Sequence, residues 1–121
     1  MNHELKQKYG RRGEDAACAA LEGKGFAVIE RNARAGGGEL DLICAGGGII
    51  VFAEVKARST AAFGAPSLAV NRAKRARTVR AAECWLAEHP EYAALQPRFD
   101  VVEVYLNTGK YHHIEAAFIK E

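Results

Sequence analysis

The sequence lacks the features that mark an exported, disulfide-linked or membrane-spanning protein. Its three cysteines, Cys18, Cys44 and Cys84, lie far apart and form neither a CxxC motif nor a cysteine–histidine spacing typical of zinc. No apolar run approaches the roughly 20 residues that cross a bilayer, and the polar N-terminus does not resemble a signal peptide. We therefore expect reduced, mostly buried thiols, no membrane partner and a cytoplasmic location.

An excess of charge of one sign is also lacking. The chain has 17 lysines and arginines against 15 aspartates and glutamates, a formal net charge of +2. Net charge alone therefore predicts no partner, and only the positions of the charges can support an argument about binding. The 121 residues, 49% of them hydrophobic, suffice for one compact core, so we expect a single domain over residues 1–121.

The order of the expected elements predicts a mixed α/β fold. Apolar periodicity and turn residues indicate a helix over residues 6–22 and strands over 26–32, 39–45 and 49–57. A second helix, with Pro66 in its first turn and Ser67 as a possible cap, should run to about His89. Strands over 98–106 and 110–118 complete a central sheet of about five strands flanked by helices.

Glycines separate the second and third expected strands. Residues 46–48 are all glycine, which tolerates the positive φ angles of tight turns, so an antiparallel hairpin is expected. The strand that follows is almost wholly apolar until Glu54 and Lys56, as in a central strand covered on both faces. Neither this triplet nor the glycines at 36–38 has the spacing of a phosphate-binding loop, so no nucleotide cofactor is expected.

Two carboxylates and a lysine form the strongest candidate site. Glu54 and Lys56 share one face of their strand, and Asp41 faces Glu54 if the hairpin loop has two or four residues. Paired carboxylates can hold Mg²⁺ or Mn²⁺, which polarises a phosphoryl oxygen and lowers the pKa of water bound to it. A neighbouring lysine can orient that water or stabilise charge during phosphodiester cleavage. A salt bridge within the sheet fits the same short pattern about equally well.

Several segments together resemble a known family. In chain order they are Arg12-Gly13-Glu14, Arg31-Asn32-x-Arg34, Gly38-Glu39-Leu40-Asp41-Leu42-Ile43, Phe52-Ala53-Glu54-Val55-Lys56-Ala57-Arg58, Phe63-Gly64, Arg98-Phe99-Asp100-Val101-Val102, and His113-Ile114 with Ala117-Phe118. On these segments the chain resembles the YraN-like family of small uncharacterised bacterial proteins. Through that family it is similar to the restriction-endonuclease-like (PD-(D/E)xK) nucleases, and among them to archaeal Holliday-junction resolvases.

The resemblance implies a restriction-endonuclease-like core with Asp41, Glu54 and Lys56 at the motif positions. Asp41 and Glu54 would then bind Mg²⁺ or Mn²⁺, and Glu14 would be an auxiliary acidic ligand, although Asp15 is adjacent and could take that place. The expected activity is a metal-dependent DNA endonuclease acting on branched or structured DNA, such as Holliday junctions, with a homodimer as a possible form. The alternative is a nucleic-acid-binding or adaptor domain that keeps the fold without cleaving.

Basic residues supply candidate contacts with phosphate. Arg58 and Ser59 directly follow the strand that carries Glu54, so they could contact the scissile phosphate or simply cap the loop. The second helix adds a basic group that spreads around the helix, so part of it should face solvent: Arg72, Lys74, Arg75, Arg77 and Arg80. His112 and His113 are adjacent in a strand and point to opposite faces, so they are not expected to share a metal ion.

Overall fold

The computed structural model describes residues 3–58 and 72–119, with side chains from residue 11 onward. The elements are α1 (His3–Gly23), β1 (Ala27–Ala35), β2 (Gly38–Gly46), β3 (Ile49–Arg58), α2 (Arg72–Glu88), the 3₁₀ turn η1 (Pro90–Tyr92), β4 (Gln96–Tyr105) and β5 (Lys110–Phe118). This order confirms the expected helix, three strands, helix and two strands. The expected start of the second helix at Pro66 and Ser67 lies outside the described residues.

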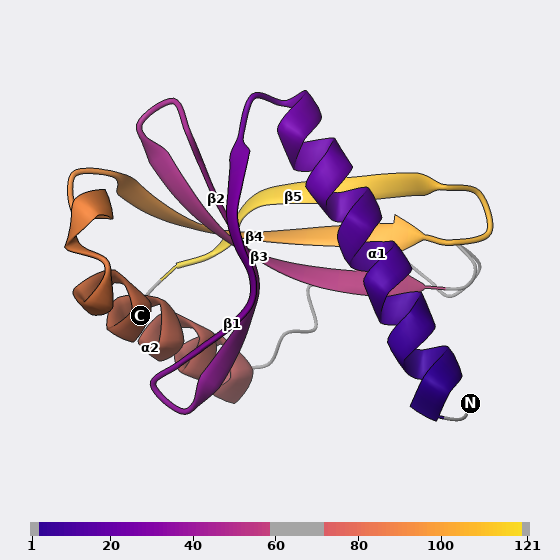
Figure 1. Cartoon of the computed structure of the whole chain (residues 1–121), viewed down its shortest axis with the longest axis horizontal. Helices are drawn as coiled ribbons and strands as arrows, with labels where there is room; N and C mark the ends of the chain where they lie inside the picture. The colour runs from indigo at the N-terminus through magenta and orange to yellow at the C-terminus, as the bar shows by residue number, and fades with distance from the viewer. Residues whose placement is uncertain (1–2, 59–71, 120–121) are drawn as a thin grey trace.

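The five strands form one mixed sheet in the order β1-β2-β3-β4-β5, which confirms β3 as the central strand. β3 pairs with β4 in parallel, whereas the other neighbours pair antiparallel. The parallel pair follows from the connection, because the chain passes through α2 between β3 and β4. Figure 1 shows β1 crossing the direction of β4 and β5 at a large angle, so the sheet is strongly twisted.

One helix packs on each face of the sheet. α1 contacts mainly β3 and β4, whereas α2 contacts β2 and β1, and Figure 1 shows the two helices at opposite ends of the molecule. Alternation along β3 explains both layers: Val51 and Ala53 face the cluster that contains Leu21, whereas Phe52 faces the cluster that contains Trp85. None of the described helices is long and apolar enough to span a membrane.

The β2–β3 hairpin has the register on which the carboxylate hypothesis depends. Residues are paired from Gly46 opposite Ile49 to Leu42 opposite Ala53. The two-residue loop consists of Gly47 and Gly48, whose φ angles of 58° and 80° favour glycine. A hairpin loop longer by one residue would have turned the Asp41 side chain to the other face of the sheet. The loop of two glycines therefore places Asp41 on the same side as Glu54.

Candidate active site

The candidate site lies where β2 and β3 stop pairing. The last pair before the strands separate is Leu42 opposite Ala53. Two residues beyond Ala53, the Val55 backbone N–H donates to Oδ2 of Asp41 over 2.9 Å, and β3 forms no further pair with β2 there. The backbone of β3 thus holds the Asp41 carboxylate at the fork between the two strands.

Several neighbouring carboxylates disfavour the charged form of Asp41. Its pKa is raised from 3.8 to about 6, mainly by burial, against the lowering effect of the Val55 hydrogen bond. The negative charges of Glu54, Glu14 and Glu39 supply the rest of this rise. Three carboxylates therefore lie within electrostatic reach of Asp41, and a bound cation would relieve this repulsion.

Glu54 connects the fork to α2. One of its carboxylate oxygens, Oε1, forms an ion pair with Nζ of Lys74. The other, Oε2, is buried and has no hydrogen-bond partner among the described residues. A buried carboxylate oxygen without a donor is costly, so it is available to a cation.

Asp41 and Glu54 open into a pocket of about 360 Å³ between the strands and α2. Lys74, Arg77 and Thr78 of α2 form its opposite wall. The pocket lining therefore contains three acids, which could hold a divalent cation, and two bases, which could hold a phosphate; the third acid is Glu39 of β2. The chemistry of this donor set fits Mg²⁺ or Mn²⁺, which commonly use one or two protein carboxylates and take further oxygens from water and substrate.

Lys56 does not belong to the described lining of this pocket. It follows Glu54 by two residues on β3, so it shares the same face, and its neighbour across the sheet is Glu103 of β4. Within residues 3–58 and 72–119, no three histidine, cysteine, aspartate or glutamate side chains come together closely enough to hold a metal ion. Asp41 and Glu54 are therefore neighbours without a ready-made third ligand in that part of the chain.

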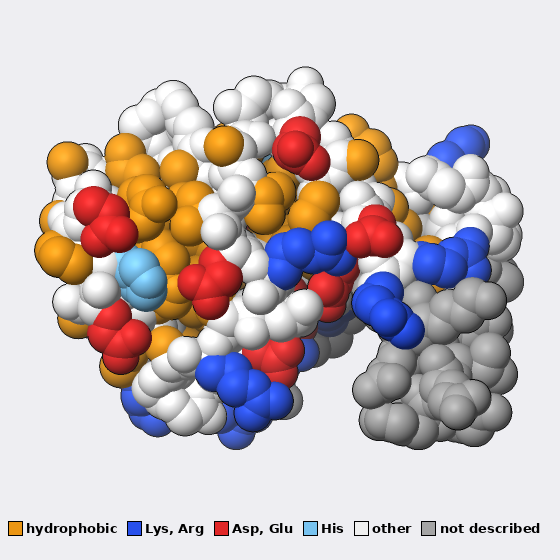
Figure 2. All heavy atoms as spheres, viewed as in Figure 1, with side chains coloured by type: hydrophobic (Ala, Val, Ile, Leu, Met, Phe, Trp, Pro, Cys, Tyr) orange, Lys and Arg blue, Asp and Glu red, His pale blue; other side chains and the backbone are white. Residues whose placement is uncertain are grey.

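Glu14, and not Asp15, is directed toward the fork. The Glu14 side chain is 16% exposed and accepts a hydrogen bond from Nδ2 of Asn32 over 3.0 Å, whereas Asp15 is 67% exposed. Arg31 Nη2 binds both acids, at 3.4 Å and 2.7 Å respectively. Of the two, only Glu14 contributes to the raised pKa of Asp41. In Figure 2, acidic and basic side chains lie next to each other in the middle of the face crossed by α1.

The basic residues of α2 divide between two surfaces. Lys74 and Arg77 line the pocket at the fork, whereas Arg72, Arg75 and Arg80 line a separate groove of about 230 Å³ with Ile119. This division is what a helix with bases around most of its circumference should give.

Arg58, at the end of β3, binds Oε2 of the fully buried Glu103 through its Nε over 3.3 Å. The Arg58 guanidinium is therefore already engaged in an ion pair inside the protein. Ser59 lies outside the described residues.

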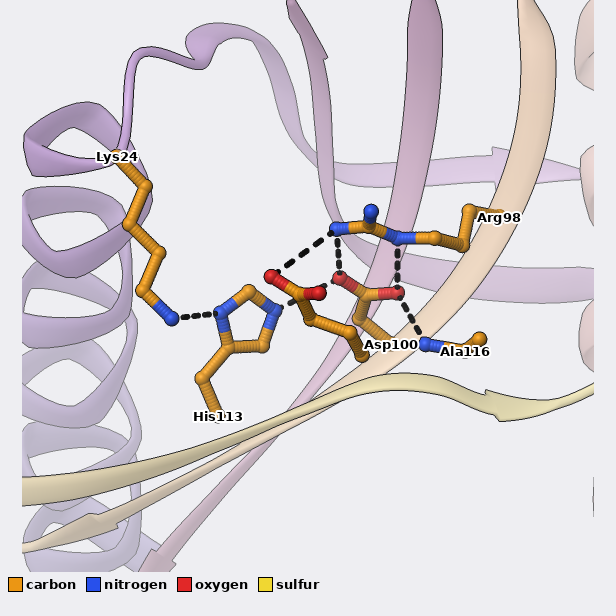
Figure 3. Close-up of polar contacts among 6 residues, drawn as sticks. Lys24, Arg98, Asp100, His113 and Ala116 are labelled. Carbon is orange, nitrogen blue, oxygen red and sulfur yellow. Dashed lines mark hydrogen bonds and ion pairs between the residues drawn. The ribbon is translucent and has the colours of Figure 1, made fainter.

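A second buried polar cluster lies on β4 and β5 (Figure 3). Asp100 is fully buried and accepts hydrogen bonds from Arg98 Nε and Nη2 (2.9 and 2.8 Å), Ala116 N (3.0 Å) and His113 Nε2 (2.7 Å). Lys24 Nζ donates to the other ring nitrogen of His113 over 2.8 Å. Burial alone would raise the pKa of Asp100, but the donors outweigh it and lower that pKa.

This cluster was not predicted from residue pattern. In the sequence, Asp100 stands out only as part of a segment that matches the family. A charged residue inside the apolar run Phe99-Asp100-Val101-Val102 is nevertheless a signal of a buried charge that needs a partner. His113, whose side chain is 1% exposed, is part of this hydrogen-bonded cluster, whereas His112 is exposed.

The fold and the site together define a class: an α/β protein whose described residues form two helices and a five-stranded sheet, with a carboxylate-lined pocket where β2 and β3 separate. Residues 13–104 match the uncharacterised protein family UPF0102, and the chain belongs to this family.

Curated relatives support this assignment over nearly the whole chain. A UPF0102 protein of Halorhodospira halophila is 44% identical over 112 residues, which cover 93% of this chain and 88% of the relative. One of Beutenbergia cavernae is 50% identical over 99 residues, with 82% and 83% covered. One of Frankia alni is 43% identical over 121 residues, with 98% and 100% covered. The expected membership of a family of small uncharacterised bacterial proteins is thus confirmed.

Proposed function

We propose that the chain is a divalent-cation-dependent DNA endonuclease. The observation that carries the proposal is the pair Asp41 and Glu54, held at the strand fork and opposed across one pocket by Lys74 and Arg77. Clustered acids alone would repel a phosphodiester, and clustered bases alone would bind it without activating water. The two together suit hydrolysis of a phosphodiester with a cation between acid and substrate.

The chain's own residues would have separate roles in this reaction. Asp41 and Glu54 would hold Mg²⁺ or Mn²⁺, with Glu14 as an auxiliary acid near them. When bound, such a cation supplies Lewis acidity and neutralises charge on the phosphate. Lys56 would orient the attacking water or stabilise charge in the transition state from the same face of β3. Arg77, opposite the acids, would hold a phosphate oxygen of the substrate.

Structured DNA is the proposed substrate class. The resemblance to junction resolvases supports a branched form, and a homodimer would let two sites cut two strands. Arg72 and Arg75 would extend the phosphate contacts along α2 beyond the pocket, because they lie on its second groove. Such contacts should make DNA binding weaken steeply with added salt.

A non-cleaving nucleic-acid-binding or adaptor domain is the second candidate. The observation that favours it is the ion pair between Lys74 and Glu54, since this pairing resembles a structural salt bridge. The two candidates differ in cation binding: the adaptor needs no site that depends on Asp41 and Glu54. Isothermal titration with Mg²⁺ or Mn²⁺ therefore discriminates between them.

The decisive experiment is cleavage of labelled single-stranded, duplex, flap and four-way-junction DNAs in Mn²⁺ by the wild type and Asp41→Asn. We expect cleavage by the wild type alone, with a preference among the four substrates. Lys56→Ala should retain Mn²⁺ binding while losing cleavage. Equal activity of the wild type and Asp41→Asn would identify a contaminant and refute the proposal.

A further inference from the structure

Lys74 occupies an unusual position for a surface lysine. It comes from α2, 20 residues after Glu54, yet its ammonium is paired with the carboxylate that the proposed function assigns to a divalent cation. Glu54 is 10% exposed in this pair, whereas Lys74 is 51% exposed and lines the open pocket. The more solvent-exposed partner of the pair is therefore the lysine.

We propose that Lys74 is the internal counter-ion of Glu54, and that a divalent cation bound at Glu54 displaces the Lys74 ammonium toward the DNA phosphate. The inference rests on the proposed function. A buried carboxylate needs a positive partner, and without a cation the nearby ammonium supplies it. A cation bound by Asp41 and Glu54 takes over this neutralisation, because a double charge at short range competes effectively with a half-exposed ammonium.

Displacement changes what Lys74 can bind. Its four-carbon side chain is flexible, and the pocket that it lines also contains Arg77 and Thr78. Once released from Glu54, the ammonium can pair with a phosphate oxygen lying over the pocket. Cation binding and DNA binding are then linked, since each favours the arrangement in which Lys74 has left Glu54.

The role differs from that of Lys56, which the motif assigns to the reaction itself. Lys56 lies on β3 outside the described lining of the pocket, whereas Lys74 faces the acids from α2 across the pocket. Lys74 is a positioning residue before the substrate arrives and a phosphate ligand afterwards. Two measurements, one without DNA and one without cleavage, separate this role from a purely structural salt bridge.

The first measurement is Mn²⁺ titration of the DNA-free protein, comparing the wild type with Lys74→Gln, Lys74→Arg and the matched control Lys110→Gln. Lys110 is an exposed lysine at the start of β5, outside the described lining of the pocket. Removing the competing charge should tighten Mn²⁺ binding by about two- to fivefold in Lys74→Gln, the range expected for a partly exposed pair. Lys74→Arg and Lys110→Gln should bind Mn²⁺ like the wild type.

The second measurement is binding of a labelled four-way junction with and without Ca²⁺, an oxygen-liganded cation used as the probe. Ca²⁺ should strengthen binding by the wild type and by Lys110→Gln, and clearly less by Lys74→Gln, with Lys74→Arg restoring the gain. Unchanged Mn²⁺ affinity in Lys74→Gln would overturn the inference while leaving the proposed function intact, provided that Asp41→Asn abolishes Mn²⁺ binding. Absence of Mn²⁺ binding by the wild type would overturn both.

Discussion

Replacing Asp41 by asparagine should stabilise the cation-free protein at neutral and alkaline pH. The pKa of Asp41 is raised from 3.8 to about 6, mainly by burial and further by the neighbouring carboxylates. A carboxyl whose pKa is higher in the folded state opposes folding whenever it is ionised in both states. Asparagine keeps an oxygen that can accept the Val55 N–H and removes the charge, so the penalty disappears.

The magnitude and its pH dependence follow from the two pKa values. Above about pH 6 the ionised carboxylate costs the folded state about 3 kcal/mol, taken at about 1.4 kcal/mol for each tenfold change in the proton equilibrium. The cost decreases as the pH falls through the folded pKa, because the folded carboxyl then takes up a proton. At pH 4 less than about 1 kcal/mol should remain, and below the ordinary value of 3.8 it vanishes.

Urea unfolding of the wild type and Asp41→Asn at pH 8 and pH 4, both in EDTA, measures this difference. Asp15→Asn is the matched control, since it makes the same change at an exposed carboxylate and should alter stability by less than about 1 kcal/mol at either pH. Adding Mn²⁺ at pH 8 should stabilise the wild type and not Asp41→Asn. Equal stability of wild type and Asp41→Asn at pH 8, or a gain that does not shrink at pH 4, would refute the electrostatic argument.

Three further substitutions, one of them paired with a control glycine, test the fold around the site by urea unfolding. Asp100→Asn should cost about 3–5 kcal/mol at pH 7, because it removes the charge of a fully buried carboxylate that pairs with Arg98. Since the pKa of Asp100 is lowered, the loss should shrink as the pH falls through that lowered pKa. Gly13→Ala should cost about 1–2 kcal/mol, because its new Cβ would lie 2.8 Å from Cβ of Ala57, whereas Gly23→Ala, with nothing within 4 Å, should not destabilise. Trp85→Phe should cost about 1 kcal/mol through loss of the Nε1 hydrogen bond to a β1 glutamate; no change would mean that water replaces it.

The sequence predicts those parts of the site that depend on neighbouring residues along the chain. Glycine at the tip of the hairpin limits the loop to a few geometries, and the two-residue form fixes the pairing from Gly46 opposite Ile49 to Leu42 opposite Ala53. Alternation then places Glu54 and Lys56 on one face. These relations are local, because each depends only on the spacing of residues within one hairpin.

Contacts made by side chains from distant elements could not be predicted in this way. The bases of α2 are visible in the sequence, but which of them reaches Glu54 depends on how the helix lies on the sheet. That placement is decided by the packing of Val79, Ala82 and Trp85 into the core rather than by the charges themselves. The contacts of Asp100 could not be predicted for the same reason, because its partner His113 belongs to another strand and the register between β4 and β5 includes a bulge.

The distribution of charge around Glu54 also shows how the proposed site can be stable when no cation is bound. Local sequence places Lys56 on the same face as Glu54, yet the ion pair is formed by Lys74 from across the pocket. A strand lysine is fixed in direction by the sheet, whereas a helix lysine at the pocket edge can reach the acid or turn to the substrate. A chain that must hold a buried acid ready for a cation therefore gains from a second, movable lysine, which neutralises the acid without occupying the site irreversibly.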